Sequence, residues 1–123
     1  MIMKIRNLLI LVFFMSFAAS SVAQSDYYIG QARQYMNDAE YYFKQAHGYE
    51  RDAEYYNKQA SDYLREADYY TRNRNYDKAQ MYSRWANEAS DKARTRLKWA
   101  AEAKDKARQR LKWAQDALEK AKR

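Results

Sequence analysis

The sequence predicts an all-α protein, a long antiparallel two-helix coiled-coil hairpin that follows a cleaved signal peptide. Three observations lead to this prediction. The chain contains no proline and only two glycines, alanine recurs at seven-residue intervals in two series, and one short polar segment separates the two series. A strict seven-residue repeat keeps one stripe of a helix against a partner in a left-handed supercoil.

The first residues have the order of a secretory signal peptide, which we assign to 1–23. Lys4 and Arg6 precede an apolar run at 8–17, and small residues lead up to Ala23. The run is about half of the roughly 20 apolar residues that a membrane-spanning helix needs, so we expect cleavage rather than a transmembrane anchor. The protein is then exported, periplasmic or extracellular, and soluble after cleavage. The absence of cysteine excludes disulfides and a lipid anchor on an N-terminal cysteine.

The alanine series define the two predicted helices, at about 26–70 and about 76–122, with a turn at 71–75 that contains two asparagines. The first series is Ala32, Ala39, Ala46, Ala53, Ala60 and Ala67, and the second is Ala79, Ala86, Ala93, Ala100, Ala107, Ala114 and Ala121. The two series are symmetric about the turn. Folding the chain there therefore places alanine opposite alanine, and such small side chains allow the two backbones to approach closely.

Charge patterning supports the same register. Residues 24–73 have six basic and nine acidic side chains, net −3, whereas residues 74–123 have fifteen basic and seven acidic ones, net +8. The residues beside the alanines predict five ion pairs between the helices: Asp38–Lys106, Glu40–Arg108, Asp52–Lys92, Glu54–Arg94 and Glu66–Lys78. Each exposed pair contributes only about 0.2–1 kcal/mol, so these pairs select the register more than they stabilise the fold.

Aromatic residues follow the same period. A tyrosine lies three residues after each alanine of the first series, which predicts cation–π contacts at Tyr49–Arg96 and Tyr35–Arg110. Other aromatic residues recur every fourteen residues and point away from the seam or lie at its edge. They form a candidate interaction surface: Tyr41, Tyr55, Tyr69, Trp85, Trp99 and Trp113. Aromatic residues in register over a long surface indicate a binding face.

The sequence gives little support to an enzyme. His47 is the only histidine and there is no cysteine, so a histidine-based nucleophile system and a zinc site both lack their residues. Acidic residues occur as i, i+2 pairs, which diverge on a helix, and no glycine-rich phosphate loop is present. We expect no catalytic residues, no metal and no cofactor.

Two functions from different classes remain. The first is a structural or protein-interaction module that self-associates through the aromatic faces, with a dimer favoured, or that binds an envelope protein. The alternative is a binder of anionic polymers (cell-wall glycan, lipopolysaccharide or nucleic acid) through the basic, tryptophan-bearing second helix. Its candidate contacts are Arg94, Arg96, Lys98, Arg108, Arg110 and Lys112. A solvated face partly neutralised by the first helix is the competing interpretation of these bases.

One short resemblance accompanies this pattern. It consists of Tyr63, Ala67, Tyr70, Tyr76, Ala79 and Ala86. Their spacing resembles that of a tetratricopeptide-repeat hairpin, in which small residues allow two helices to pack closely around a turn. The resemblance covers 24 residues, and no second copy follows at the period of about 34 residues. It implies close helix packing near the turn, and we transfer no binding role from it.

Overall fold

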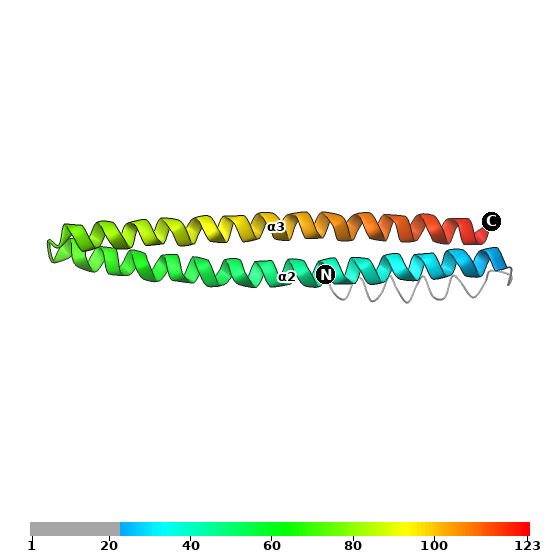
Figure 1. Cartoon of the computed structure of the whole chain (residues 1–123), viewed down its shortest axis with the longest axis horizontal. Helices are drawn as coiled ribbons and strands as arrows, with labels where there is room; N and C mark the ends of the chain where they lie inside the picture. The colour runs from blue at the N-terminus through cyan, green and yellow to red at the C-terminus, as the bar shows by residue number, and fades with distance from the viewer. Residues whose placement is uncertain (1–22) are drawn as a thin grey trace. The chain divides into compact units, whose positions relative to one another are not determined.

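The computed structural model describes residues 23–123 of the chain. These residues form two α-helices, α2 (Ala23–Arg72) and α3 (Tyr76–Lys122), and contain no β-strand (Figure 1). The predicted all-α class and two-helix hairpin are confirmed. Helix α2 continues two residues past its predicted end, which shortens the turn to 73–75. The signal peptide predicted at 1–23 lies outside the described residues, except for Ala23.

The composition explains why both segments are helical. Alanine, lysine, arginine, glutamate and glutamine have high helix propensity, and no proline interrupts either segment. Charged residues also match the helix dipoles: Asp26 lies in the first turn of α2, and Lys120 and Lys122 lie in the last turn of α3. No helix over residues 23–123 combines the length and the apolar character that crossing a membrane requires.

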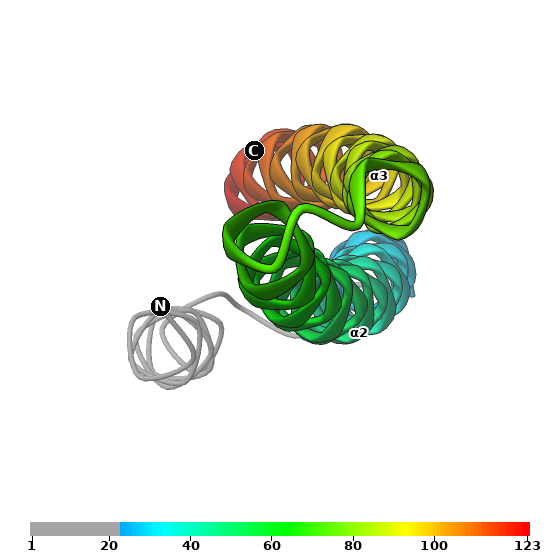
Figure 2. The same cartoon turned by 90° about the vertical axis from the view of Figure 1, so that its left-hand side faces the viewer.

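Helix α2 ends in a Schellman motif. The Asn75 amide donates to the Tyr70 carbonyl at 2.9 Å, and the Arg74 amide donates to the Thr71 carbonyl at 3.1 Å. Arg74 occupies the left-handed region with φ of 59°, a conformation that favours glycine or asparagine over a long side chain. Figure 2 shows the chain crossing from α2 to α3 through this turn.

Asn75 also begins the next helix. Its carbonyl accepts the first helical hydrogen bond of α3, from the Ala79 amide at 3.1 Å. Its side-chain Oδ1 accepts a longer bond of 3.4 Å from the Lys78 amide, three residues ahead. This is the arrangement of an N-cap asparagine. One residue therefore closes α2 and opens α3, which explains why so short a turn suffices.

The described residues divide into two compact units, which we treat separately. Unit 1 contains residues 23–44 and Ala103–Arg123, and unit 2 is Gln45–Glu102. Within each unit the segments of α2 and α3 lie side by side (Figure 1). Residues further along α2 contact residues that come earlier in α3. In unit 2, for example, Tyr49 contacts Trp99, whereas Tyr63 contacts Trp85. The paired segments are therefore antiparallel.

The cores of the two units differ in composition. Unit 1 buries Met36 and Phe43 along with its alanines, and Leu111 and Leu118 pack against them. Every buried residue of unit 2 is alanine: Ala46, Ala53, Ala60, Ala67, Ala79, Ala86, Ala89, Ala93 and Ala100. The alanine stripe predicted from the sequence is buried in both units, and only unit 1 adds large aliphatic and aromatic side chains to it.

Candidate interaction surface

Four exposed tyrosines of α2 form what we call the tyrosine row: Tyr27, Tyr41, Tyr55 and Tyr69. Their exposed fractions lie between 59% and 63%. Each ring packs edge-on against the tyrosine that follows it in the chain, with ring centroids 5.2–5.5 Å apart. Tyr27 and Tyr41 belong to unit 1, and Tyr55 and Tyr69 to unit 2, so each unit presents the same pair of outward-facing rings.

The tyrosine that follows each member of the row lies under a lysine from α3. In unit 1, Lys120 is 5.9 Å from the ring centroid of Tyr28, and Lys106 is 5.7 Å from that of Tyr42. The same contact occurs twice in unit 2, where the distances are 5.6 Å for Lys92–Tyr56 and 5.2 Å for Lys78–Tyr70. These cation–π contacts join α2 to α3 within each unit.

Arginines of α3 link acidic and aromatic groups. In unit 1 the Arg110 Nε lies 3.9 Å from Asp38 Oδ2, and its guanidinium lies 4.3 Å from the ring centroid of Trp113. The ring centroid of Tyr42 lies 5.7 Å from the same guanidinium. The Arg110 side chain is only 22% exposed, so this cation is largely covered by the groups that bind it.

Unit 2 repeats this arrangement fourteen residues away along each helix. Arg96 Nε lies 3.9 Å from Asp52 Oδ2, and its guanidinium lies 4.6 Å from the ring centroid of Trp99 and 5.9 Å from that of Tyr56. The repetition shows that the fourteen-residue period of the sequence is also a period of the contacts. The predicted cation–π partners Tyr49 and Tyr35 instead pack against tryptophan.

The five ion pairs predicted between the helices are not the ion pairs of the described structure. All three lysines of the predicted pairs lie over tyrosine rings: Lys78, Lys92 and Lys106. Two of their acids, Asp38 and Asp52, bind the arginine four residues beyond the predicted lysine. The predicted antiparallel pairing of the helices agrees with these contacts, but the predicted α3 partners of Asp38 and Asp52 are wrong.

The direction of helical side chains explains this correction. Every Cα–Cβ bond is tilted toward the N-terminus of its helix. In an antiparallel pair, α2 side chains therefore lean toward the chain termini, and α3 side chains lean toward the turn. Lys106 lies on the turn side of Asp38, so these two diverge. Arg110 lies on the terminal side and leans back toward Asp38, so these two converge.

Three residues of the remaining predicted pairs bind a neighbour on their own helix instead. Arg94 binds Asp91 at 2.8 Å, and Arg108 binds Asp105 at 3.2 Å. Glu40 binds Lys44 at 3.6 Å. Among residues 23–123, Glu54 and Glu66 form no ion pair. A neighbour one helical turn away requires less side-chain ordering than a partner on another helix, so the local pair is favoured.

Each tryptophan packs edge-on against a tyrosine of α2. The centroid distances are 5.6 Å for Tyr35–Trp113 in unit 1, and 5.5 Å for Tyr49–Trp99 and 5.7 Å for Tyr63–Trp85 in unit 2. All three tryptophans are 38% exposed. The candidate surface predicted from the sequence therefore contains two kinds of ring: outward-facing tyrosines and tryptophans held partly in place by other rings.

Near the turn, Tyr82 occupies the position that Arg96 and Arg110 occupy in the fourteen-residue repeats that follow it. Tyr82 stacks on Tyr70 with ring centroids 5.5 Å apart and an interplanar angle of 5°. It also contacts Trp85 at 5.3 Å and Tyr63 at 6.2 Å. These four rings form an aromatic cluster that spans both helices.

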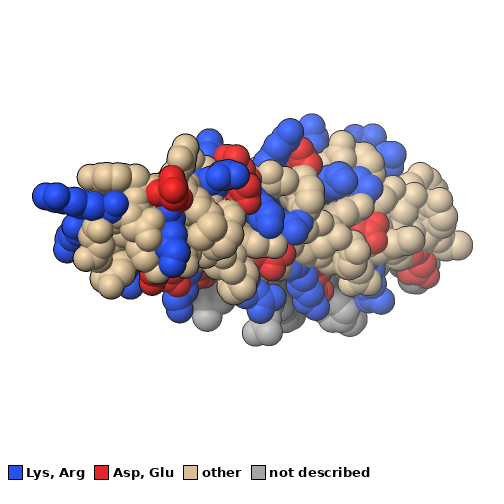
Figure 3. Space-filling model, turned by 60° about the vertical axis from the view of Figure 1, so that its left-hand side comes forward, with Lys and Arg blue, Asp and Glu red and all other residues tan. Residues whose placement is uncertain are grey.

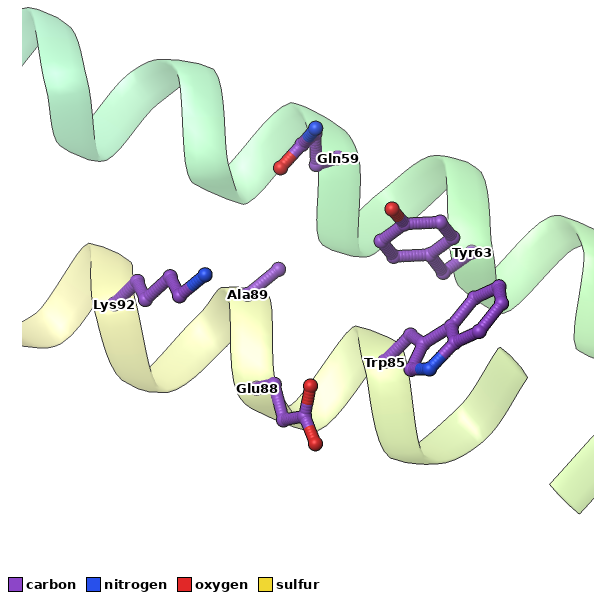
Figure 4. A pocket seen from close by; sticks show the side chains of 6 residues that line it. All are labelled: Gln59, Tyr63, Trp85, Glu88, Ala89 and Lys92. Atoms are coloured by element: carbon purple, nitrogen blue, oxygen red, sulfur yellow. The ribbon is translucent and has the colours of Figure 1, made fainter. Parts of the chain in front are cut away.

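Beside the tryptophans, the structure contains two hollows of matching composition. Hollow 1, in unit 1, has a volume of about 320 Å³ and is lined by Gln31, Tyr35, Trp113, Asp116, Ala117 and Lys120. Hollow 2, in unit 2, has a volume of about 260 Å³ and is lined by Gln59, Tyr63, Trp85, Glu88, Ala89 and Lys92 (Figure 4). Residues at matching positions are 28 apart in the chain. Sequence reasoning missed these sites, although the repeated glutamines and acids signalled them.

Most of the bases predicted to contact anionic polymers have acidic partners. Arg94, Arg96, Arg108 and Arg110 each lie within an ion pair. In the part of the chain that the structure describes, Lys98 and Lys112 have no such partner. Figure 3 shows blue and red side chains interspersed on the visible face rather than gathered into one basic patch.

Other chemistry is sparse in the described residues. The His47 Nδ1 lies 3.7 Å from Glu50 Oε1 on the same helix. Residues 23–123 contain no group of three or more His, Cys, Asp or Glu side chains placed to hold a metal ion. Comparison with known proteins found no matching family model, no matching curated protein and no matching solved structure.

Proposed function

We propose that the chain is an exported coiled-coil module with a structural or protein-interaction role, and that it self-associates, as a dimer, through the tyrosine row. The observation that supports this proposal is an inverted distribution of side-chain size. Almost all buried apolar residues of the described chain are alanines, whereas five tyrosines, three tryptophans and two leucines are exposed.

The energetic consequence concerns the lone hairpin. Burial of apolar surface contributes about 25 cal/mol per Å², and an alanine side chain offers little such area. No large side chain in residues 23–123 is fully buried. Small folds with so limited a core usually need a further source of stability, such as association with another chain. A second copy supplies a large apolar surface of the same chemistry.

The tyrosine row suits an interface between identical chains. In a two-fold dimer the same patch on each copy meets itself, so rings repeated every fourteen residues meet rings with the same repeat. Tyrosine supplies a large contact area at low conformational-entropy cost and is enriched at interfaces. Exposed fractions of 59% in Tyr41, Tyr55 and Tyr69 leave most of each ring available.

Sedimentation velocity over a range of protein concentrations tests the proposal. We expect a dimer that persists at high salt, because its contacts are aromatic rather than ionic. Tyr41→Ser, Tyr55→Ser and Tyr69→Ser combined should shift the protein to monomer, since a truncated hot-spot ring typically costs about 2 kcal/mol of association. Tyr76→Ser is the matched control, because Tyr76 is 64% exposed but lies outside the row.

Two outcomes would contradict this proposal. One is a monomer at every concentration measured. The other is a dimer that survives loss of the three rings while circular dichroism shows unchanged helix content. A monomer that binds heparin only at low salt would favour the anionic-polymer alternative, for which Lys98 and Lys112 supply the bases without acidic partners among the described residues.

Export is tested separately. We propose cleavage after Ala23, supported by the basic, apolar and small-residue order of the first 23 residues. Mass spectrometry of the protein recovered outside the cytoplasm should give a chain that begins at Gln24. Recovery of an uncleaved chain beginning at Met1 would show that the segment is not a cleaved signal peptide.

A further inference from the structure

We propose that hollow 1 and hollow 2 are equivalent binding sites, each for one pyranose ring of a neutral polysaccharide. This inference goes beyond self-association and does not depend on it, because the hollows lie beside the tryptophans rather than on the tyrosine row. Their linings agree at every position except for an aspartate in hollow 1 where hollow 2 has a glutamate.

The indole ring supplies the apolar part of each site. Trp85 and Trp113 are both 38% exposed, and their angles to the adjoining tyrosine ring, 62° and 69°, are nearly equal. Each indole is held by the residue three positions before it, Tyr82 or Arg110. Aromatic surface fixed in this way fits the C–H face of a sugar ring, since both groups are apolar and nearly flat.

The polar groups around each indole suit sugar hydroxyls. A hydroxyl both donates and accepts hydrogen bonds, so it needs donors and acceptors together. The lining of hollow 2 supplies a donor in Lys92, an acceptor in Glu88 and both kinds of group in the Gln59 amide, one N–H of which already donates to the Tyr55 hydroxyl at 3.1 Å. Figure 4 shows these side chains around the small side chain of Ala89, with the Tyr63 and Trp85 rings at one end.

The charges that line each hollow favour a neutral polysaccharide over an anionic one. Each hollow contains one lysine and one acid, so its formal charges cancel. Each lysine also lies over a tyrosine ring, Lys92 over Tyr56 and Lys120 over Tyr28. A site with cancelling charges gives little electrostatic attraction to a polyanion, whereas a neutral, hydroxyl-rich ring uses both groups.

The volume of each hollow fits one sugar ring, and the presence of two equivalent hollows on one chain favours a polymeric ligand. The volumes of about 260 and 320 Å³ lie near the lower end of the roughly 300–1,000 Å³ range of small-molecule sites, which suits one ring. The two hollows present the same arrangement of lining residues twice on one chain. Several weak sites on one chain bind a repeating ligand more tightly than any single site does.

Tryptophan fluorescence of the purified chain tests the proposal. We titrate it with cellohexaose and with N-acetylchitohexaose, both neutral, and with polygalacturonate as the anionic comparison. We expect a saturable fluorescence change with at least one neutral hexasaccharide that persists at high salt. Ala89→Met and Ala117→Met combined alter the lining alanine of both hollows and should weaken binding at least about tenfold.

Matched variants keep the result interpretable. Ala101→Met places the same side chain on an exposed α3 position outside the hollows and should leave binding unchanged. If the double methionine variant loses helix content, Gln31→Ala with Gln59→Ala removes polar contacts without altering the alanine seam, and should weaken binding about threefold or more. In parallel, sedimentation velocity reports the oligomeric state of every variant.

Several outcomes would overturn the proposal. These are no fluorescence change with either neutral hexasaccharide, binding of polygalacturonate alone with loss at high salt, or neutral-sugar binding that neither set of hollow variants weakens. A shift from dimer to monomer in the hollow variants, without sugar binding by the wild type, would show instead that the hollows receive side chains of a second copy. Self-association through the tyrosine row is judged separately, by the Tyr41, Tyr55 and Tyr69 variants.

Discussion

Unit 1 and unit 2 share one repeat of contacts but differ in what they bury. Both have an alanine seam, a lysine over a tyrosine, and an arginine between an aspartate and a tryptophan. Unit 1 adds Phe43, which is 8% exposed and packs with Leu111. The equivalent region of unit 2 leaves Leu64 and Leu97 about half exposed. The two units therefore pair through the same contacts, and we expect their local stabilities to differ because only unit 1 buries large side chains.

The largest expected effect comes from the large buried side chains. Phe43→Ala should lower the free energy of unfolding by about 3 kcal/mol, because it removes a buried ring from unit 1. Leu64→Ala is the matched control, since Leu64 also follows a seam alanine by four residues but is 55% exposed; its cost should stay within about 0.5 kcal/mol. Denaturant unfolding followed by circular dichroism measures both. Equal costs would show that the two units have equivalent cores.

The aromatic cluster near the turn is the exception within unit 2. Tyr82→Ala should cost about 2 kcal/mol of stability, because one ring contacts Tyr63, Tyr70 and Trp85. Tyr82→Arg should cost less, since arginine at this position reproduces the arrangement of Arg96 over a tyrosine and a tryptophan. Hydrogen exchange of the amides near the turn reports the local effect. If amide exchange rates near the turn are the same in both variants, arginine at position 82 does not replace the stabilisation that the tyrosine ring provides.

A substitution in the turn of unit 2 is expected to stabilise the protein. Arg74→Gly should raise the free energy of unfolding by about 1 kcal/mol, because φ of 59° disfavours a residue with a Cβ atom. Arg72→Gly removes the same charge from the last residue of α2 and should destabilise the protein instead. Thermal unfolding of the two variants compares them directly. A fall in stability on Arg74→Gly would mean that its side chain contributes more than its backbone costs.

The arginine–tryptophan contact occurs in both units, and we expect a small effect on stability when the arginine is replaced. Arg110→Lys in unit 1 and Arg96→Lys in unit 2 each exchange a planar guanidinium, which stacks on tryptophan, for an ammonium. We expect a loss of about 0.5 kcal/mol for each, and nearly the same loss for both. Chemical denaturation of the two single variants measures this. A marked inequality would contradict the view that the contacts repeat energetically as well as geometrically.

Much of the fold was predictable because it depends on local chemistry. Alanine spacing predicted the two helices and the buried stripe, and the polar segment near Asn73 predicted the turn. The candidate surface was predicted only in composition. Tyr41, Tyr55 and Tyr69 are exposed as expected, whereas Trp85, Trp99 and Trp113 divide their surface between solvent and neighbouring rings.

The ion pairs were predicted wrongly for a physical reason. Sequence symmetry relates Cα positions, but an ion pair depends on where the ends of two long side chains meet. The tilt of the Cα–Cβ bonds moves that meeting point by about one helical turn, from Lys106 to Arg110 opposite Asp38. Sequence symmetry also does not show that a lysine lies over a ring rather than beside a carboxylate.

The helical class, the alanine seam and the fourteen-residue period could all be predicted before the fold was known, because each follows from residue type and spacing along one helix. Three features became visible only in the folded protein: the side chains that meet across the seam, the burial of Phe43 in unit 1 against alanine alone in unit 2, and the hollows beside Trp85 and Trp113. Those features depend on the direction and length of side chains from two helices at once, and spacing along a single chain does not contain that information.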